Sequence, residues 1–78
     1  MPHFFFVWND QIIDHLAEHE ISTEEFEQVV CNPLAVRESR SSGRPVAFGV
    51  TEGGRQILCI YELFENDTVL PITAYEVQ

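Results

Sequence analysis

Residues 15–19 have the composition and spacing of a short metal-binding motif. His15, Glu18 and His19 match the pattern H-x-x-E-H, in which the two histidines stand one helical turn apart and can share a zinc ion. Enzymes of that class take a third ligand from a much larger domain, and the rest of this sequence offers no convincing one. The same spacing places His19 beside the apolar side of a helix, where its ring can pack on the core. We therefore expect a structural or partner-contacting role for the pair, with no metal and no cofactor.

The arginines form a second group that could bind a substrate. Arg37, Arg40 and Arg44 fall in one short segment, and Arg55 comes at the start of a later strand. A guanidinium group binds phosphate oxygens in pairs, and the serines and the glycine between residues 39 and 43 can add further donors. We expect Arg40, Arg44 and Arg55 to bind phosphate or another anion if strand pairing brings them together. The alternative is that each arginine pairs with a surface carboxylate.

A third group lies near the ends of predicted strands. Tyr61, Tyr75 and Glu76 carry hydroxyl and carboxyl groups that can transfer protons, although sheet packing and a solvated charge are the simpler explanation. Cys31 and Cys59 are expected to be reduced and to act as small buried hydrophobic side chains. The sequence contains no phosphate-binding loop, dinucleotide fingerprint, nucleophile elbow or paired CxxC motif.

The histidine pair falls on the first of two predicted helices. Residues 4–8 are aromatic and typical of a strand, and Asn9 or Asp10 can cap the helix that follows and ends at His19. The second helix has the clearest start. Ser22 is followed three residues later by Glu25, which is the pattern of a capping box.

The arginines and tyrosines fall on predicted strands and on the loops between them. The glycine-containing segment 52–55 predicts a hairpin turn, and residues 56–64 are apolar on both faces, which is typical of a central strand. Pro71 cannot donate to a strand ladder, so the last strand should lie at an edge or contain a bulge. The strands are expected at residues 34–38, 46–51, 56–64 and 68–75.

Length and charge limit the class of protein. The 78 residues predict one domain, residues 1–78, and the formal net charge of −9 disfavours contact with nucleic acid and with anionic membranes. The same charge favours a basic protein partner. The sequence contains neither a signal peptide nor an apolar stretch long enough to span a membrane, and we expect a cytoplasmic protein.

These elements predict an α+β fold, in which two short N-terminal helices pack on an antiparallel sheet of about three or four strands. The helices would cover one face of the sheet. The other face still carries apolar residues, which indicates contact with a partner or a homodimer.

The order of the segments resembles the BrnT family of bacterial toxins over nearly the whole chain. The resemblance rests on the aromatic strand that ends in Phe6-Val7-Trp8-Asn9, the helix that ends at His19, and the segments Ile21–Glu27, Asn32-Pro33-Leu34, Phe48–Thr51, Gly54-Arg55, Ile57–Tyr61 and Pro71–Glu76. It implies a fold similar to RelE-like ribonuclease toxins, metal-independent RNA cleavage, and neutralisation by an antitoxin. By this resemblance, His19 and Arg55 are the candidate catalytic residues.

Three functions stay open from the sequence. The first is a ribonuclease toxin of a toxin–antitoxin system, although an acidic chain holds RNA weakly. The second is a non-catalytic module that binds a protein partner through its acidic helices or its exposed sheet. The third is an α+β homodimer with a small-molecule or regulatory role.

Overall fold

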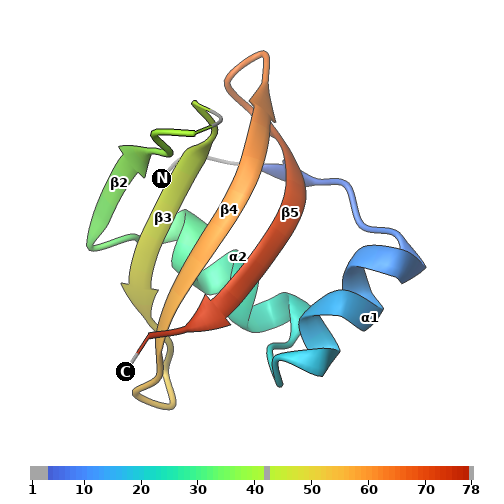
Figure 1. Cartoon of the computed structure of the whole chain (residues 1–78), viewed down its shortest axis with the longest axis vertical. Helices are drawn as coiled ribbons and strands as arrows, with labels where there is room; N and C mark the ends of the chain where they lie inside the picture. Colours follow the sequence, from blue (N-terminus) through green and yellow to red (C-terminus); the bar gives the residue numbers. More distant parts are fainter. Residues whose placement is uncertain (1–3, 42, 78) are drawn as a thin grey trace.

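The structure, a computed structural model, describes residues 4–41 and 43–77. Two helices follow a very short first strand and precede four further strands (Figure 1). The helices are α1 (Asp10–Glu18) and α2 (Thr23–Cys31). The strands are β1 (Phe5–Phe6), β2 (Ala35–Glu38), β3 (Pro45–Val50), β4 (Gln56–Phe64) and β5 (Thr68–Glu76). This arrangement confirms the predicted α+β class.

The five strands form one mixed sheet in the order β1-β5-β4-β3-β2. Strands β2 to β5 pair antiparallel with their neighbours in sequence, and β4 is central, as predicted. Strand β1 runs parallel to β5, with Phe5 beside Thr68 and Phe6 beside Val69. The predicted antiparallel sheet of three or four strands is therefore wrong in strand number and in one orientation. A two-residue strand that pairs across most of the chain leaves no local turn signal from which its direction could be predicted.

Pro71 lies at an irregularity in the sheet. The register between β4 and β5 shifts between Ile60, whose partner is Thr73, and Tyr61, whose partner is Pro71. The extra residue forms a bulge, which lets a residue without an N–H sit within the strand. Strand β1 pairs with β5 only at residues 68 and 69, so Pro71 also lies beyond the end of that partner.

Both helices begin at side-chain caps. The Asn9 side chain accepts a hydrogen bond of 2.8 Å from the Ile12 N–H at the start of α1. At the start of α2, Ser22 and Glu25 form the predicted capping box, with two reciprocal bonds of 3.1 Å. No helix within the described ranges has the length and apolarity needed to cross a membrane.

The C-terminal end of α1 has an unusual backbone. Glu20 has a φ of 60°, in the left-handed region that favours glycine. Its N–H donates to Ala17 and the next N–H, of Ile21, donates back to Leu16. This is the Schellman arrangement that ends many helices. It turns the chain sharply so that α2 can begin three residues later.

The hydrophobic core lies between α2 and one face of the sheet. Helix α2 contacts β3 and β4, whereas α1 lies against β5 (Figure 1). Small residues let α2 approach closely, because a Cβ added to Gly49 would lie 3.3 Å from Cγ1 of Val29. The buried apolar side chains of the core are Leu16, Ile21, Phe26, Val29, Val30, Ala47, Ile57, Cys59, Tyr61, Val69 and Ala74.

An aromatic cluster joins the N-terminal segment to this core. The Trp8 ring lies 5.4 Å from the Phe26 ring in an edge-to-face arrangement, and Phe6 contacts both rings. The indole N–H of Trp8 donates to Glu27 at 2.8 Å, so its polar atom is satisfied. The predicted aromatic strand forms backbone pairs at only two residues, so it is joined to the core mainly by its side chains.

Candidate functional site

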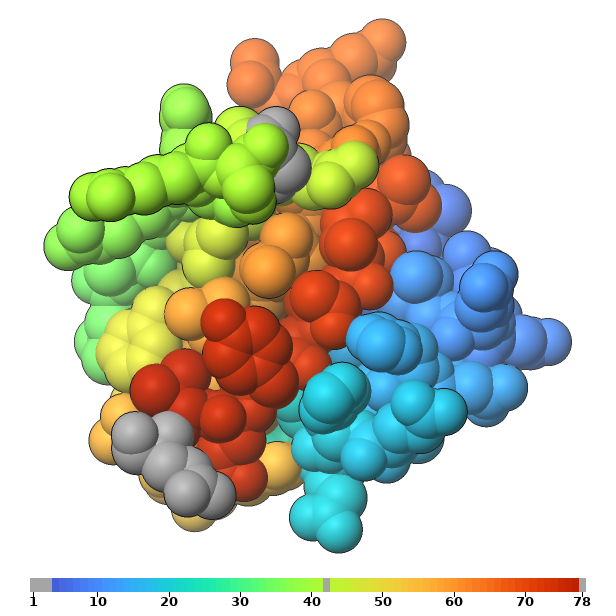
Figure 2. Space-filling view, viewed as in Figure 1, coloured from blue at the N-terminus to red at the C-terminus, as the bar shows by residue number. Residues whose placement is uncertain are grey.

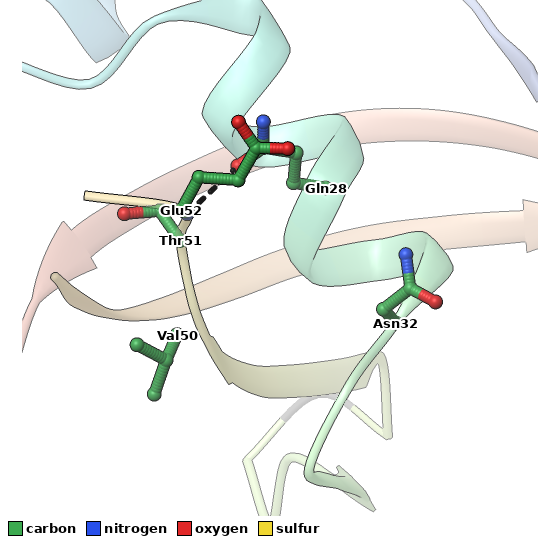
Figure 3. Close-up of a pocket in the computed structure, with 5 residues that line it drawn as sticks. All are labelled: Gln28, Asn32, Val50, Thr51 and Glu52. Carbon is green, nitrogen blue, oxygen red and sulfur yellow. Dashed lines mark hydrogen bonds between the residues drawn. The ribbon is translucent and has the colours of Figure 1, made fainter. Parts of the chain in front are cut away.

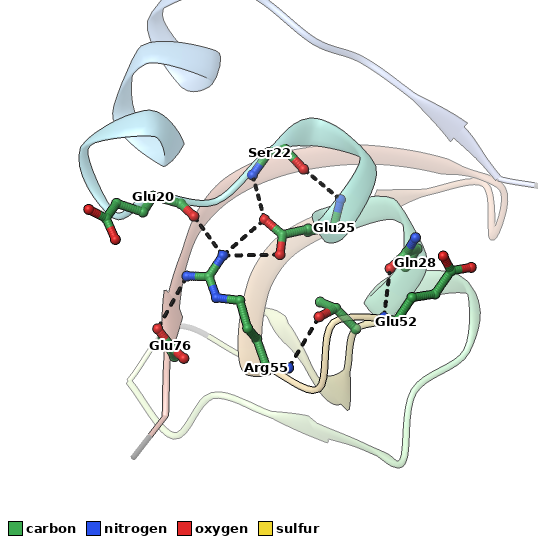
Figure 4. A network of polar contacts seen from close by, with 8 residues as sticks. Glu20, Ser22, Glu25, Gln28, Glu52, Arg55 and Glu76 are labelled. Atoms are coloured by element: carbon green, nitrogen blue, oxygen red, sulfur yellow. Dashed lines mark hydrogen bonds and ion pairs between the residues drawn. The ribbon is translucent and has the colours of Figure 1, made fainter.

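Arg55 is the centre of a polar network. Its guanidinium group donates to both carboxylate oxygens of Glu25 at 3.0 Å, to the Glu20 carbonyl at 2.7 Å and to Glu76 at 3.2 Å (Figure 4). These bonds connect the start of β4 with the α1–α2 link, the first turn of α2 and the end of β5. The pKa of Arg55 lies above its usual value, first because of the hydrogen bond to Glu76 and then because of Glu25. An incoming phosphate would have to compete with two carboxylates for this cation.

The two histidines of the sequence motif lie next to each other. The ring centroids of His15 and His19 are 5.3 Å apart, and the rings meet edge to face. A nitrogen of His15, Nε2, lies 2.8 Å from the Thr73 hydroxyl on β5. His19 immediately precedes Glu20, so both catalytic candidates, His19 and Arg55, lie at one corner of the molecule. Within residues 4–41 and 43–77, no three His, Cys, Asp or Glu side chains converge in a way that could hold a metal ion.

The arginines predicted to bind an anion do not form one site. Arg44 precedes β3 and Arg55 precedes β4, and these strands are antiparallel, so the two residues lie at opposite ends of the pair. Arg44 forms an ion pair of 2.8 Å with Glu62. Arg40 lies in the loop between β2 and β3, at the Arg44 end. The pairing that was expected to bring the arginines together therefore separates them, although the role of each in anion binding remains a prediction.

The cysteines and Tyr61 are placed for packing. Burial raises the pKa of the Cys59 thiol to about 12, and Cys59 lies fully inside the core. Cys31 is partly exposed, and its pKa is raised by burial and then by the nearby Glu27 carboxylate. Tyr61 is buried, and its pKa is also raised, first by burial. None of these three groups is ionised near neutral pH, so none is prepared to act as a nucleophile or base.

The side of the sheet that faces away from α2 is apolar, and we call it the open face. Four residues from four strands form a continuous row across it, because Ala35 pairs with Phe48, Phe48 with Leu58, and Leu58 with Tyr75. A second row continues the face from Arg37 through Val46 to Ile60. Glu62 and Leu70 form a further pair beside these rows. Figure 2 looks onto this face, where atoms of β3, β4 and β5 lie uncovered and α1 flanks them at the β5 side.

A hollow of about 310 Å³ lies in the open face. Its lining comes from β2, β3, β4 and the residue after β5, and consists of Ala35, Arg37, Val46, Phe48, Leu58 and Val77. Five of these six side chains are apolar, and Arg37 supplies the only charge of the lining. Tyr75 lies beside Leu58 on the same face and keeps 43% of its surface exposed. The open face therefore carries both a cavity and a large projecting side chain.

A second hollow lies between α2 and the β3–β4 turn, and it offers less chemistry. It has a volume of about 250 Å³ and is lined by Gln28, Asn32, Val50, Thr51 and Glu52 (Figure 3). The Gln28 side chain is already used, because its oxygen accepts a bond of 3.4 Å from the Glu52 N–H. The polar groups of this lining are two amides, one hydroxyl and the carboxylate of Glu52. The lining contains no cationic side chain beside which a base or nucleophile could act.

Sequence reasoning missed the partners of Arg55. The sequence predicts the capping box of Glu25, and in the structure Glu25 forms that box and an ion pair with Arg55 at once. Glu76, a candidate for proton transfer, forms an ion pair with Arg55. No spacing in the sequence links Glu25, Arg55 and Glu76, because the three residues come from three elements that meet only in the folded chain.

Comparison with protein-family profiles, with curated proteins and with solved structures finds no match to this chain. The resemblance to BrnT-type toxins is therefore a prediction from residue order. The function has to be argued from the open face and from the Arg55 corner.

Proposed function

We propose that this chain is a non-catalytic protein-binding module of BrnT-like organisation, and that its contact surface is the open face of the sheet. The observation that carries this proposal is the uninterrupted row from Ala35 through Phe48 and Leu58 to Tyr75, which no helix covers. An antiparallel sheet with one solvated face normally alternates apolar and polar residues. Here the residues that point away from the core are themselves mostly apolar.

The apolar open face is unfavourable in a monomer, because its side chains remain in contact with water. Contiguous apolar surface on a folded chain usually marks a contact with another protein. The hollow and the projecting Tyr75 give that surface relief, which favours a specific partner over general stickiness. Arg37 and the Arg44–Glu62 pair add polar groups that can orient the partner.

The net charge of −9 favours a basic partner at long range. Seven of the thirteen acidic residues lie between residues 10 and 27, on the helices and their link. An antitoxin or another basic protein would be drawn to the acidic helices, which leaves the open face to an occupant selected by apolar contact. Binding of RNA is weak in this proposal, because the same charge repels phosphates.

A metal-independent ribonuclease of BrnT type is the second candidate. It is favoured by one observation: Arg55 binds the carbonyl of Glu20, the residue that follows His19, so that a phosphate-binding cation lies close in the chain fold to a candidate base. The engagement of Arg55 with Glu25 and Glu76 weighs against it, since both carboxylates neutralise the group that would stabilise the transition state.

Incubation of the purified protein with a mixed RNA pool at low salt separates the two candidates. Parallel samples contain EDTA, and Arg55→Ala and His19→Ala variants are tested beside the natural chain. We expect no cleavage by any of them. Cleavage that survives EDTA and disappears with either variant would replace the binding module by the ribonuclease.

Site-specific photocrosslinking in cells tests the open face directly. A photoreactive amino acid at position 60 samples this face, and one at position 13 on α1 is the matched control at an exposed apolar site. We expect a crosslinked protein from position 60 that is lost when Leu58→Glu is added. Equal crosslinking from both positions, or crosslinking that is insensitive to Leu58→Glu, would remove the open face as the contact surface.

A further inference from the structure

We propose that the occupant of the open face is a second copy of this chain, with the two sheets stacked face to face about a two-fold axis that runs along β4. This inference rests on the proposed protein-binding function and names its partner. It implies a dimer in which the two sheets lie inside, the two α2 helices lie outside, and each α1 lies beside the sheets at the β5 edge.

Self-complementary relief is the first argument. The hollow lies on the β3 side of the open face, and Tyr75 projects from β5 on the other side of β4. Rotation about an axis along β4 exchanges these two sides, so each Tyr75 would face the hollow of the other copy. One surface then supplies both halves of two identical contacts, as a two-fold interface requires. The tyrosine hydroxyl would come near Arg37 at the edge of that hollow, where it can accept a hydrogen bond.

Charge separation is the second argument. A second copy has the same charge of −9, so stacking is favourable only where acidic groups are sparse. Among the acidic residues of the strands, only Glu62 belongs to the open face, since Glu76 turns to Arg55 and Glu38 alternates with Arg37. Two sheets spaced by about 10 Å would keep the two α2 helices, which lie behind the sheets, farther apart than the Debye length of about 8 Å.

The residual charge on the open face is balanced. Glu62 lies on β4, near the proposed axis, and would approach its counterpart in the second copy. In each copy Arg44 already neutralises it at 2.8 Å. Two such pairs make a cluster of four charges with no net charge, at the end of the face remote from Tyr75.

The available area is the third argument. Strands β2, β3, β4 and β5 contribute 4, 6, 9 and 9 residues, so at about 3.3 Å per residue and about 4.8 Å between strands the face spans roughly 440 Å² in projection. Side-chain relief makes the accessible area larger than this projection. A stable interface buries about 800 Å² on each partner. The projected face supplies more than half of that area before side-chain relief is counted, and a small domain gains more from such burial than a large one does.

Sedimentation analysis of the purified chain tests the dimer. We expect a mass of twice 9.0 kDa at concentrations between about 1 and 200 µM, with a measurable dissociation constant. Leu58→Glu places a carboxylate on the axis and should leave the chain monomeric. Tyr75→Ala empties the hollow and Ala35→Phe fills it, so each should weaken the dimer at least tenfold. Ile13→Glu on α1 is the control and should have no effect.

Combining Tyr75→Ala with Ala35→Phe sharpens the test. Both changes remove the same contact, so the double variant should be little weaker than either single variant. Far-UV circular dichroism of each variant checks that the fold is kept, and Tyr75 and Ala35 are exposed enough that their replacement leaves the core intact.

The failure of this inference can be told from the failure of the proposed function. A natural chain that is monomeric at about 200 µM, or a dimer that Leu58→Glu leaves unchanged, overturns the self-association. If such a monomer still crosslinks another protein from position 60, and Leu58→Glu abolishes this, the binding function stands and its partner is different. If neither self-association nor crosslinking depends on the open face, both proposals fall.

Discussion

Two adjacent residues of β4 test the division between core and open face on which both proposals depend. Ile57 is fully buried under α2, whereas Leu58 is partly exposed on the opposite side. Their side chains differ only in branching, and each can be shortened to alanine with little change in strand backbone. The variants Ile57→Ala and Leu58→Ala therefore compare the two faces at one place in the sheet.

The expected costs differ by several-fold. Ile57→Ala removes three buried carbon atoms, each worth about 0.8 kcal/mol, and leaves a closed cavity, so about 3–4 kcal/mol is expected. Leu58→Ala removes the same number from a surface that water already reaches, and no closed cavity forms, so about 1 kcal/mol is expected. A stability of about 0.05–0.15 kcal/mol per residue gives a chain of 78 residues roughly 4–12 kcal/mol in total. The first variant thus loses a large part of its stability and the second a small part.

Urea unfolding followed by Trp8 fluorescence measures both free energies. Trp8 contacts Phe26 in the core, so its emission reports the packing that unfolding destroys. The comparison is made at about 1 µM and in a Tyr75→Ala background, because dimerisation would add a concentration-dependent cost to Leu58→Ala. A cost above about 3 kcal/mol for both variants would mean that the open face is covered within one chain. That result would refute the division into a core side and an open side.

Four further predictions concern other parts of the chain. Glu20→Gly should raise the free energy of unfolding by about 1 kcal/mol, because glycine adopts a φ of 60° without strain; an equal gain in the control Glu20→Ala would assign the effect to lost charge. In native protein at pH 8, iodoacetamide should modify Cys31 long before Cys59, as read by peptide mass spectrometry, and equal rates would contradict the burial of Cys59. The pKa of the Cys59 thiol is 9.0 in the unfolded chain and is raised to about 12 by burial, so this thiol does not change the stability with pH below about 9 and lowers it by about 1.4 kcal/mol per pH unit between about pH 9 and 12. In Cys59→Ala, the free energy of unfolding should lose the part of its alkaline decrease that comes from this thiol. An unchanged decrease would exclude Cys59 as its cause. Raising the salt concentration should tighten the proposed dimer, because screening weakens the repulsion between two copies of charge −9, whereas a weaker dimer would point to ion pairs as its main contact.

Local features of the fold were predictable because each is encoded within a few residues. The capping box of Ser22 and Glu25 forms as expected, since the motif and the helix start are the same four residues. The bulge at Pro71 follows from the missing N–H of one residue. The small side chains of Ala47 and Gly49 lie on one face of β3, and α2 packs closely on that face.

Long-range features were not predictable from the same patterns. The parallel pairing of β1 depends on where β5 ends up, and the two share no turn. The ion pairs of Arg55 depend on three elements meeting at one corner, and the separation of Arg44 from Arg55 depends on which ends of β3 and β4 adjoin. The positions of arginines along the sequence do not show which ends of two strands will adjoin. For this reason the sequence predicts one anion site, whereas the structure places Arg44 and Arg55 at two separate ends of the sheet.

The pairing of β1 with β5 also determines the order of events when a ribosome makes this chain. Phe5 and Thr68 stand 63 positions apart, so at about 5–20 residues per second the first strand waits roughly 3–13 s for its partner to be synthesised. During that interval Phe4, Phe6 and Trp8 have no sheet to join, and they form an apolar segment on the nascent chain. We expect a chaperone that acts at the tunnel exit to bind this segment, and its release to coincide with the appearance of β5. Strand β5 would thus be the element that withdraws these aromatic residues from solvent.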